Sequence, residues 1–433
     1  MPFSLRQVDG ATIRPRTRAP LWALPLLLLA AVFLPGQVWS SLLIAWGGLL
    51  LVSYLWARGL AQGIHGRRHL RFGWAAVGDR LSEQFELHNQ SLWPAPWIEL
   101  LDASTVPGYQ ASVVHGLGAG ERTEWRYAAI CERRGQFRLG PWQLRAADPL
   151  GIFEVRRPYQ DSAEIIIHPP TQSDIPIPLP AGTSSGQTRA RVRSWQATIN
   201  AATVRDHQPH DPLRWVHWPT TARRGQLFVR EFDLDAAGDI WLLLDMDPAV
   251  QLGEGRDNTE EQAVLLAAAM AARALAKNRA VGLVSYGRNP QLIPPAAGEG
   301  QQWRLLRALA LLQADGQTAL ATALQDFRQT ARRGATAVIV TPSASPDWLP
   351  HLLPLAQQGL SLSLILLERR SFGDDQSSQG VYDSLRQLGF AAHLLHKGEI
   401  RPPALDPAQR RGFWEFRTLA TGKVITVRSP VVE

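Results

Sequence analysis

Residues 239–249 read Asp-Ile-Trp-Leu-Leu-Leu-Asp-Met-Asp-Pro-Ala, an apolar run that ends in two carboxylates. Five consecutive apolar residues bounded by acidic and turn residues are typical of a strand that is buried on both faces. Downstream, helical patterns alternate with further apolar strands: helices are expected at 260–277, 303–312 and 319–332, and strands at 280–286, 335–340 and 360–367. This alternation predicts, for residues 239–433, an α/β domain with a mostly parallel sheet covered on both faces.

Upstream of this domain, residues 72–165 follow a period of two. Apolar and polar side chains alternate around Phe85 and again around Trp125, and glycine and proline separate such stretches. The pattern predicts a small β-sandwich. Residues 166–200 are rich in proline and glycine, which indicates an extended linker, and residues 201–238 form a separate segment before the α/β domain.

The N-terminal part of the chain has the pattern of a membrane anchor. Residues 19–57 contain no Asp, Glu, Lys or Arg. As one helix they would run about 58 Å, roughly twice the thickness of a bilayer core, and turn-forming residues lie near 35–37, so two transmembrane helices are expected. Arginines occur in the segments 1–18 and 58–71 and not in the turn, which predicts a cytoplasmic N-terminus, a basic juxtamembrane segment and a cytoplasmic C-terminus. The alternative is a cleaved signal peptide, but a second apolar run follows Leu34 where a small-residue cleavage signal would stand.

The composition limits the class of protein. At 433 residues the chain exceeds what one hydrophobic core usually organises, and 45% hydrophobic with 19% charged residues excludes both a disordered chain and a polytopic transporter. The net charge is +7, and it comes almost entirely from arginine, because the lysines are only Lys277, Lys397 and Lys423. The single cysteine, Cys131, cannot form an internal disulfide or a cysteine-based zinc site, and we expect it to be buried.

An ordered series of motifs precedes and enters the α/β domain. The series runs through Val204-Arg205-Asp206, Leu213 to Trp218, Ala222 to Leu227, Arg230-Glu231-Phe232 and Leu242 to Asp245. It resembles the signature of the bacterial family catalogued as domain of unknown function 58. The stretch Asp148 to Phe153, with Arg133-Arg134-Gly135 before it, resembles further segments of that family. His207 and His210 depart from it, because tyrosine and glycine are expected there.

The resemblance covers nearly the whole chain and implies its organisation and role. It implies a membrane hairpin in the bacterial inner membrane, a β-domain and a domain similar to von Willebrand factor A. It also implies a partner, a MoxR-type AAA+ ATPase. This chain has no G-x-x-x-x-G-K-[ST] loop, so ATP hydrolysis would belong to that partner. We therefore expect a scaffold or adaptor in complex assembly or envelope maintenance, with no catalytic residue.

A degenerate metal site is the basis of an alternative function. Domains of the von Willebrand A type hold a divalent cation between loops at the carboxyl edge of the sheet. Asp245 keeps the opening position of the first loop, Asp247 replaces a serine, Ala249 replaces the second serine, and Thr318 resembles the threonine of the second loop. The third loop has Ser343 where an aspartate would stand. Asp245, Asp247 and Thr318 could hold Mg²⁺ or Mn²⁺ for a metal-dependent enzyme, or Asp245 and Thr318 could cap the following helices.

Arginine and tryptophan are concentrated in residues 189–230. Such a patch suits phosphates, so binding of an anionic lipid or a nucleic acid is a further alternative, although a membrane anchor disfavours nucleic acid. Acidic residues that follow at once could instead neutralise the patch within the fold. The candidate partner-binding or signature residues are Arg205, Asp211, Trp215, Trp218, Arg223, Arg230 and Glu231.

Overall fold

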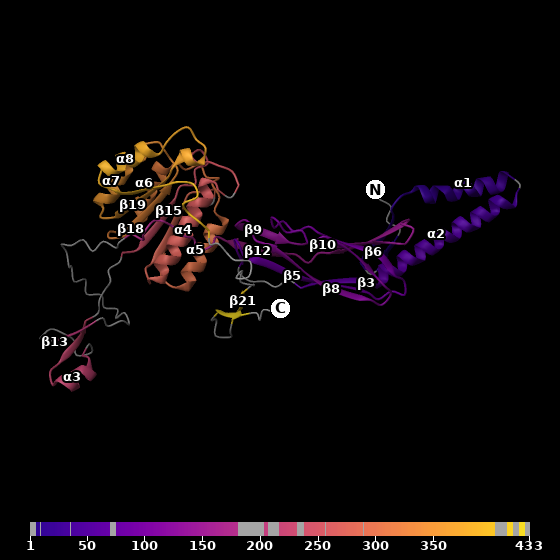
Figure 1. The fold of residues 1–433 in the computed structure, drawn as a ribbon, viewed down its shortest axis with the longest axis horizontal. Helices are drawn as coiled ribbons and strands as arrows, with labels where there is room; N and C mark the ends of the chain where they lie inside the picture. Colours follow the sequence, from indigo (N-terminus) through magenta and orange to yellow (C-terminus); the bar gives the residue numbers. More distant parts are fainter. Residues whose placement is uncertain are drawn as a thin grey trace. The chain divides into compact units, whose positions relative to one another are not determined.

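A computed structural model shows the chain as two compact units (Figure 1). The first unit comprises residues 1–174, 306–312 and 401–433, and the second comprises 175–305 and 313–400. The structure describes residues 6–8, 10–34, 36–69, 75–180, 203–206, 216–231, 238–255, 257–288, 290–402, 414–418 and 424–428.

The first unit is a β-sandwich. Its strands are β1 (Arg6–Val8), β2 (Ala11–Pro15), β3 (Ile64–His69), β4 (Ala75–Ala76), β5 (Arg80–Asn89), β6 (Ala95–Asp102), β7 (Val113–Leu117), β8 (Arg122–Ile130), β9 (Gly135–Leu139), β10 (Trp142–Ala147), β11 (Phe153–Tyr159) and β12 (Ala163–His168). One sheet has the order β1-β2-β11-β10-β6-β7, and two smaller sheets have the orders β3-β5-β8 and β4-β12-β9.

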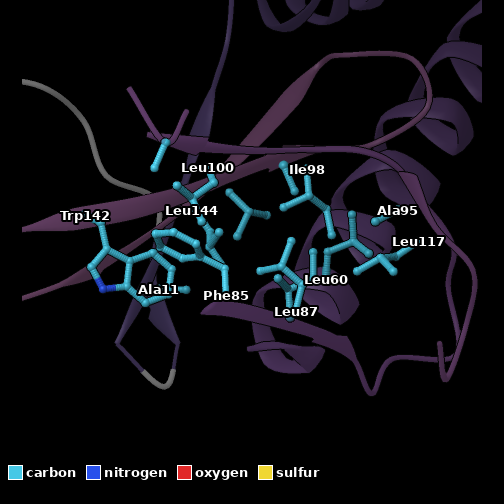
Figure 2. Packing of buried hydrophobic residues seen from close by; sticks show 14 of the residues in the cluster. Ala11, Leu60, Phe85, Leu87, Ala95, Ile98, Leu100, Leu117, Trp142 and Leu144 are labelled. Carbon is cyan, nitrogen blue, oxygen red and sulfur yellow. The ribbon is translucent and has the colours of Figure 1, made fainter. Parts of the chain in front are cut away.

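Alternating side chains build the core of this sandwich. In β5 every second residue is buried, from Leu81 to Asn89. Phe85 and Leu87 of β5 lie in one cluster with Leu100 of β6 and Leu144 of β10 (Figure 2). Burying each such side chain contributes roughly 1.5–3 kcal/mol. The period of two in the sequence therefore arises because one face of each strand is turned to the core.

The sandwich begins earlier in the chain than residue 72. β2 pairs with β11, with Ile13 opposite Val155, and Ala11 and Ile13 are fully buried. β3 pairs with β5. The segments 1–18 and 58–71 thus supply strands to the sandwich, whereas the sequence predicted a terminus and a basic juxtamembrane segment.

Two apolar helices lie between β2 and β3 in the chain. These are α1 (Ala19–Phe33) and α2 (Gln37–Gly63), and they contact each other (Figure 1). Among the described helices, α2 alone is long and apolar enough to cross a membrane, and α1 is a shorter apolar helix. α2 also continues past the predicted end at residue 57, because its last turns pack into the sandwich core through Ala57, Leu60 and Ala61.

The second unit contains an α/β sheet, as predicted. Its strands are β15 (Ile240–Leu244), β16 (Val281–Ser285), β17 (Gln291–Ala296), β18 (Thr336–Thr341), β19 (Ser361–Leu367) and β20 (Ala391–Leu395), and its helices are α4 (Thr259–Ala276), α6 (Leu320–Thr330), α7 (Leu352–Gln357) and α8 (Gln379–Gln387). Helix α5 (Glu299–Leu311) is divided, with its residues up to Leu305 in the second unit and those from Leu306 in the first. The strand order is β17-β16-β15-β18-β19-β20, and only β17 runs antiparallel to its neighbour. Side chains of α6, α7 and α8 cover one face in a single buried cluster. Right-handed crossovers on the two sides of β15 place α4 on the other face.

Three further pieces complete the description. Short 3₁₀ helices occur at Leu349–His351 and Arg369–Phe372. A hairpin of β13 (Thr203–Asp206) and β14 (Phe228–Glu231) encloses α3 (Trp218–Arg224) in sequence. β21 (Trp414–Thr418) and β22 (Val424–Arg428) form a hairpin that is grouped with the first unit. The second unit therefore ends at Ile400, earlier than the predicted boundary at residue 433.

Candidate functional site

The carboxyl edge of the α/β sheet gathers the polar residues that follow β15, β18 and β19. Parallel strands bring the loops after their carboxyl ends to one edge, which is where open α/β sheets bind ligands. The first of these loops begins at Asp245, the second contains Pro342 and Ser343, and the third begins at Glu368. This edge is the candidate functional site of the second unit.

Asp245 joins two of these loops from inside. Its side chain lies directly after β15, and the residue is only 4% exposed. Its Oδ2 accepts a hydrogen bond of 2.6 Å from the hydroxyl of Thr341, and its Oδ1 accepts one of 3.2 Å from the backbone N–H of Asp247. Burial raises the pKa of Asp245 to about 6, although both hydrogen bonds oppose that shift. Asp245 is therefore an internal tie between the loops after β15 and β18.

Arg369 ties the same loops from the other side. Its Nη1 donates to the carbonyl oxygens of Val250 (3.0 Å) and Pro342 (3.2 Å). Its Nε donates to Asp374 at 2.6 Å, and the side chain is 11% exposed. Hydrogen bonds from a guanidinium are among the stronger ones in proteins. The loops after β15 and β18 are thus fixed relative to each other by one planar cation.

The predicted metal ligands Asp245 and Asp247 lie in one loop and make hydrogen bonds within the fold. Oδ1 of Asp247 accepts from the backbone N–H of Ala249 at 2.9 Å, and both oxygens of Asp245 are engaged as described above. Thr318 lies between α5 and α6 and, within the described part of the chain, has no hydrogen bond to either carboxylate. No cluster of three or more His, Cys, Asp or Glu able to hold a metal occurs among the described residues. Mg²⁺ and Mn²⁺ require several oxygen ligands around one point, and the site of Asp245, Asp247 and Thr318 stays a prediction.

The alternative prediction was that Asp245 and Thr318 cap the helices that follow them. α4 is capped by Asn258, whose Oδ1 accepts a hydrogen bond of 2.6 Å from the N–H of Glu261. α6 follows Ala319, which makes no side-chain cap. Neither Asp245 nor Thr318 therefore caps the helix that follows it.

The signature segment is described in part. Strand β13 pairs antiparallel with β14. In the backbone register Arg205 lies opposite Val229, Arg230 lies opposite Val204, and Glu231 lies opposite Thr203. Asp211 and Trp215 lie outside the described residues. The structure thus brings Arg205, Arg230 and Glu231 onto one two-stranded ribbon.

Helix α3 presents the other two signature residues to solvent. His217 caps its start, with Nδ1 accepting a hydrogen bond from the N–H of Thr220, and Gly225 ends it in the left-handed conformation. Trp218 is 64% exposed and Arg223 is exposed. An exposed tryptophan followed by arginines is typical of a contact surface.

A groove lies between α6 and α7 in the second unit. Its volume is about 830 Å³, and it is lined mostly by glutamine and arginine side chains with His351 among them. Nδ1 of His351 lies 3.3 Å from the amide nitrogen of Gln325. No nucleophile with an adjacent base lines this groove, so we assign it no chemistry.

The fold defines an α/β protein whose edge loops are tied together by hydrogen bonds, joined in the chain to a β-sandwich with an apolar helix. Residues 203–371 match the family model described as "Protein of unknown function DUF58". The match confirms the resemblance that the motif series predicted. It covers the signature segment and the sheet strands from β15 to β19.

Relatives of the chain bear no functional name. "Uncharacterized protein YeaD" of Bacillus subtilis is 22% identical over 268 residues, which cover 62% of this chain and 65% of that protein. "Uncharacterized protein Mb1516" of Mycobacterium bovis is 28% identical over 212 residues, which cover 48% and 64%. The chain therefore spans just under two thirds of the length of the curated relatives it matches.

A solved structure described as "von Willebrand factor type A from Catenulispora acidiphila" is 12% identical to the chain, with a TM-score of 0.26. The likeness covers 37% of this chain and 39% of that one. A score this low does not bear on the fold, which rests on the strand order given above.

Sequence reasoning placed Thr341 in the third predicted metal loop without giving it a role, and it missed Arg369. A signal for Arg369 was present, because only one residue separates it from the end of the buried strand β19. Charged residues in that position lie at the ligand-binding edge of a parallel sheet. Thr341 carries no comparable signal, since a threonine at a strand end is common for reasons of β propensity alone.

Proposed function

We propose that this chain is a membrane-anchored adaptor. In this proposal α1 and α2 hold it in the inner membrane of a bacterium, both termini lie in the cytoplasm, and the second unit, acting as a von Willebrand A-like domain, docks a partner protein. The proposed role is not enzymatic.

The placement of α2 is the observation that carries the anchor. Most of its length is apolar and exposed, while Leu60 and Ala61 near its end are fully buried in the sandwich core. A cleaved signal sequence would remove part of that core. A core helix of a soluble protein would be buried along its whole length, and exposed leucine, isoleucine and valine side chains along α2 argue against that.

Strand pairing at both ends of the helical pair supports two crossings. β2 precedes α1 and β3 follows α2, and both strands pair within the first unit. A chain that leaves this unit through α1 must therefore return to the same side through α2. α1 spans about 22 Å, short for a bilayer core of about 30 Å, and local thinning of the bilayer accommodates such a mismatch at modest cost.

The arrangement of the sheet edge supports docking. Its loops are fixed by Asp245, Thr341 and Arg369 before any partner arrives, which lowers the entropic cost of binding. The family resemblance implies a MoxR-type AAA+ ATPase as the partner, and we propose that this ATPase binds at the carboxyl edge. The chain would then provide the membrane attachment and the binding surface, and the partner would hydrolyse ATP.

Orientation is tested with a tag fused after Glu433. Intact spheroplasts and lysed spheroplasts are treated with protease, and the tag is followed on blots. We expect protection in the intact cells and cleavage after lysis, because the proposal places the tag in the cytoplasm. Cleavage in intact spheroplasts would contradict the proposal.

Docking is tested by purification of the tagged chain from solubilised membranes. We expect a stoichiometric AAA+ ATPase to accompany it. Asp347→Arg changes an exposed residue after β18 and should reduce recovery of the ATPase about tenfold. Arg332→Glu changes an exposed residue before β18, at the opposite edge, and should leave recovery unchanged. Equal recovery with both variants would remove the carboxyl edge from the proposal.

A further inference from the structure

Two apolar tips project from the end of the sandwich at which α2 enters it. One is Leu92, in the loop between β5 and β6, and the other is Leu150, in the turn between β10 and β11. Leu92 is 92% exposed and Leu150 is 57% exposed. Leucines this exposed at loop tips have no role in the core of the unit.

A buried asparagine builds the loop that carries Leu92. Asn89 is fully buried, and its amide group donates to the carbonyl oxygens of Trp93 and Gly118, both at 2.9 Å. Its side-chain oxygen accepts from the hydroxyl of Ser91 at 2.6 Å and from the Ser91 N–H at 3.1 Å. These hydrogen bonds fix the conformation of the loop, and the fixed loop holds the Leu92 side chain in solvent.

The same loop is clamped to α2. The Trp93 ring lies 4.5 Å from the Trp56 ring between centroids, and Nε1 of Trp56 donates to the carbonyl oxygen of Pro94 at 2.9 Å. At Gly59 an added Cβ would lie 2.5 Å from the Trp93 ring, so the ring rests directly on the helix backbone. Leu92 consequently stands beside α2 at the level of Trp56 to Gly59.

A buried aspartate builds the second tip in the same manner. Asp148 is 1% exposed, and its carboxylate accepts from the N–H groups of Phe153 (2.6 Å) and Leu150 (3.0 Å). Phe153, at the end of this turn, packs edge-on against Tyr54 of α2 with ring centroids 5.7 Å apart. The Asp148 to Phe153 stretch, which resembles a family segment, thus presents Leu150 beside α2.

The two tips flank α2 at one height. Tyr54 and Trp56 are two positions apart in α2. Their side chains therefore point about 200° apart around the helix and differ by only about 3 Å along it. We call Leu92, Trp93 and Leu150 the collar. It surrounds α2 at the point where the exposed apolar part of the helix meets the part buried in the sandwich.

Basic side chains accompany the collar. Arg16 donates its backbone N–H to the carbonyl oxygen of Ile152 in the second tip, at 2.9 Å, and its side chain is exposed. Arg18 precedes α1 directly, and Arg58 follows Trp56 on α2, and both are exposed. Glu121 is the acidic neighbour, and its carboxylate already accepts from the N–H of Gly118 at 2.6 Å.

We propose that the collar inserts into the interfacial layer of a bilayer that contains anionic phospholipid. Tryptophan and tyrosine concentrate at that layer in membrane proteins, leucine enters the acyl boundary, and arginines pair with phosphate headgroups. The inference rests on the proposed anchor, since it takes α2 as the crossing helix. It adds a second attachment, through which the sandwich is held against the membrane and cannot swing freely about the end of α2.

Fluorescent probes in reconstituted protein test this insertion. The full chain carries Cys131→Ala and one new cysteine, at Leu92→Cys or Leu150→Cys, labelled with an environment-sensitive dye. It is reconstituted into vesicles of phosphatidylcholine with or without phosphatidylglycerol, in which some lipids are brominated near the headgroup. We expect about twofold quenching at both positions, and more with phosphatidylglycerol than without it.

Two control positions make the anchor and the collar separable. Ile44→Cys lies on α2, where the side chain is 75% exposed, about 18 Å along the helix from Trp56. It is measured in a parallel set of vesicles whose lipids are brominated at mid-chain, and it should be quenched there if α2 crosses the bilayer. Ile130→Cys lies at the far end of β8, roughly 27 Å along the strand from Arg122, and should not be quenched.

Each outcome has one meaning. Quenching at Leu92, Leu150 and Ile44 but not at Ile130 supports the collar. Quenching at Ile44 without quenching at the collar overturns the collar and leaves the anchor standing. No quenching at Ile44 overturns the anchor, and the collar with it. A blue-shifted but unquenched collar probe indicates a protein partner, such as a second copy of the chain, and also overturns the inference.

Discussion

Arg68 is buried between two carboxylates in the sandwich. Its Nε donates to Glu83 at 2.8 Å and its Nη1 donates to Asp102 at 3.0 Å, and all three side chains are at most 2% exposed. Tyr109 donates its hydroxyl to Glu83 as well. Burial raises the pKa of Glu83 despite the opposing effect of Arg68. One arginine therefore balances two acids in a region of low polarity.

Removing that arginine should be strongly destabilising. We expect Arg68→Leu to cost about 3–5 kcal/mol of sandwich stability, because two buried carboxylates lose their countercharge. The measure is the opening free energy of β5 amides from hydrogen exchange. Arg67→Leu, at the exposed neighbouring position, should change it by less than about 0.5 kcal/mol. Similar values for the two variants would show that the ion pairs add nothing.

Asp245 should make the second unit sensitive to pH. Its pKa is about 6 in the folded chain against 3.8 for the unaltered group, so the folded state binds the proton more tightly. The stability contributed by this proton is complete below about pH 4 and is lost as the pH rises through 6, a difference of about 3 kcal/mol.

The check is a comparison with Asp245→Asn. Urea unfolding of the second unit is measured between pH 4 and pH 7 for both proteins. The difference between their unfolding free energies should change across this range and be constant above about pH 6.5. Parallel curves would mean that the carboxyl group does not titrate in this window.

At the level of residues, the sequence revealed the roles of some side chains and not of others. Asp245 was predicted at the sheet edge because it ends a buried strand. Its hydrogen bond to Thr341 was beyond prediction, since 96 residues separate the two in the chain. The same holds for Arg68 and Asp102, which read as surface charges in isolation and pair only when β3 and β6 are brought together.

Among elements, the junction of α2 and β3 is tightly packed. An added Cβ at Gly63 would lie 2.4 Å from the backbone nitrogen of Ser91. Gly63→Ala should therefore destabilise the sandwich by about 1–3 kcal/mol through forced backbone movement. Gly48→Ala, on the same helix with open space around it, should be neutral or stabilising. Thermal unfolding of the reconstituted protein compares them, and equal midpoints would contradict this account.

The loops of the sheet edge depend on Arg369. Loss of its bonds to Val250 and Pro342 in Arg369→Gln should speed hydrogen exchange in residues 246–252 and 342–348 by about tenfold or more. The matched control is Arg370→Gln, which changes an exposed neighbour. If exchange in both loops is the same in the two variants, the guanidinium does not fix them.

Elements were predicted best where the pattern was uniform. β15 was identified because it is apolar throughout, and the helices after it because their helical periods extend over many residues. β2 and β3 are at least as long as β15, but they were missed because each carries arginines and adjoins an apolar helix, so that its alternation was read as flanking charge. The sequence did not predict the strand pairing, because partners such as β2 and β11 lie some 140 residues apart in the chain.

For the whole molecule, the proposed anchoring and docking functions belong to different units. The sandwich holds both ends of the helical pair, and the α/β unit holds the edge proposed to bind a partner. Ile13→Asp, which charges a fully buried position of β2, should open the sandwich to protease and leave the second unit resistant. Thr12→Asp, on the half-exposed face of the same strand, is the control. Equal resistance of both variants would show that β2 is dispensable.

The position of the helical pair between β2 and β3 also orders events on the ribosome. β2 is made before α1, yet its partner β11 follows some 140 residues later, so roughly 7–30 s of translation pass before the two can meet. If only one of the two helices crossed during that interval, a bilayer would separate β2 from β11. Such a copy could never close its sandwich and would stay open to quality-control proteases. In the proposed membrane-anchored arrangement, folding would thus act as a proofreading step for membrane insertion.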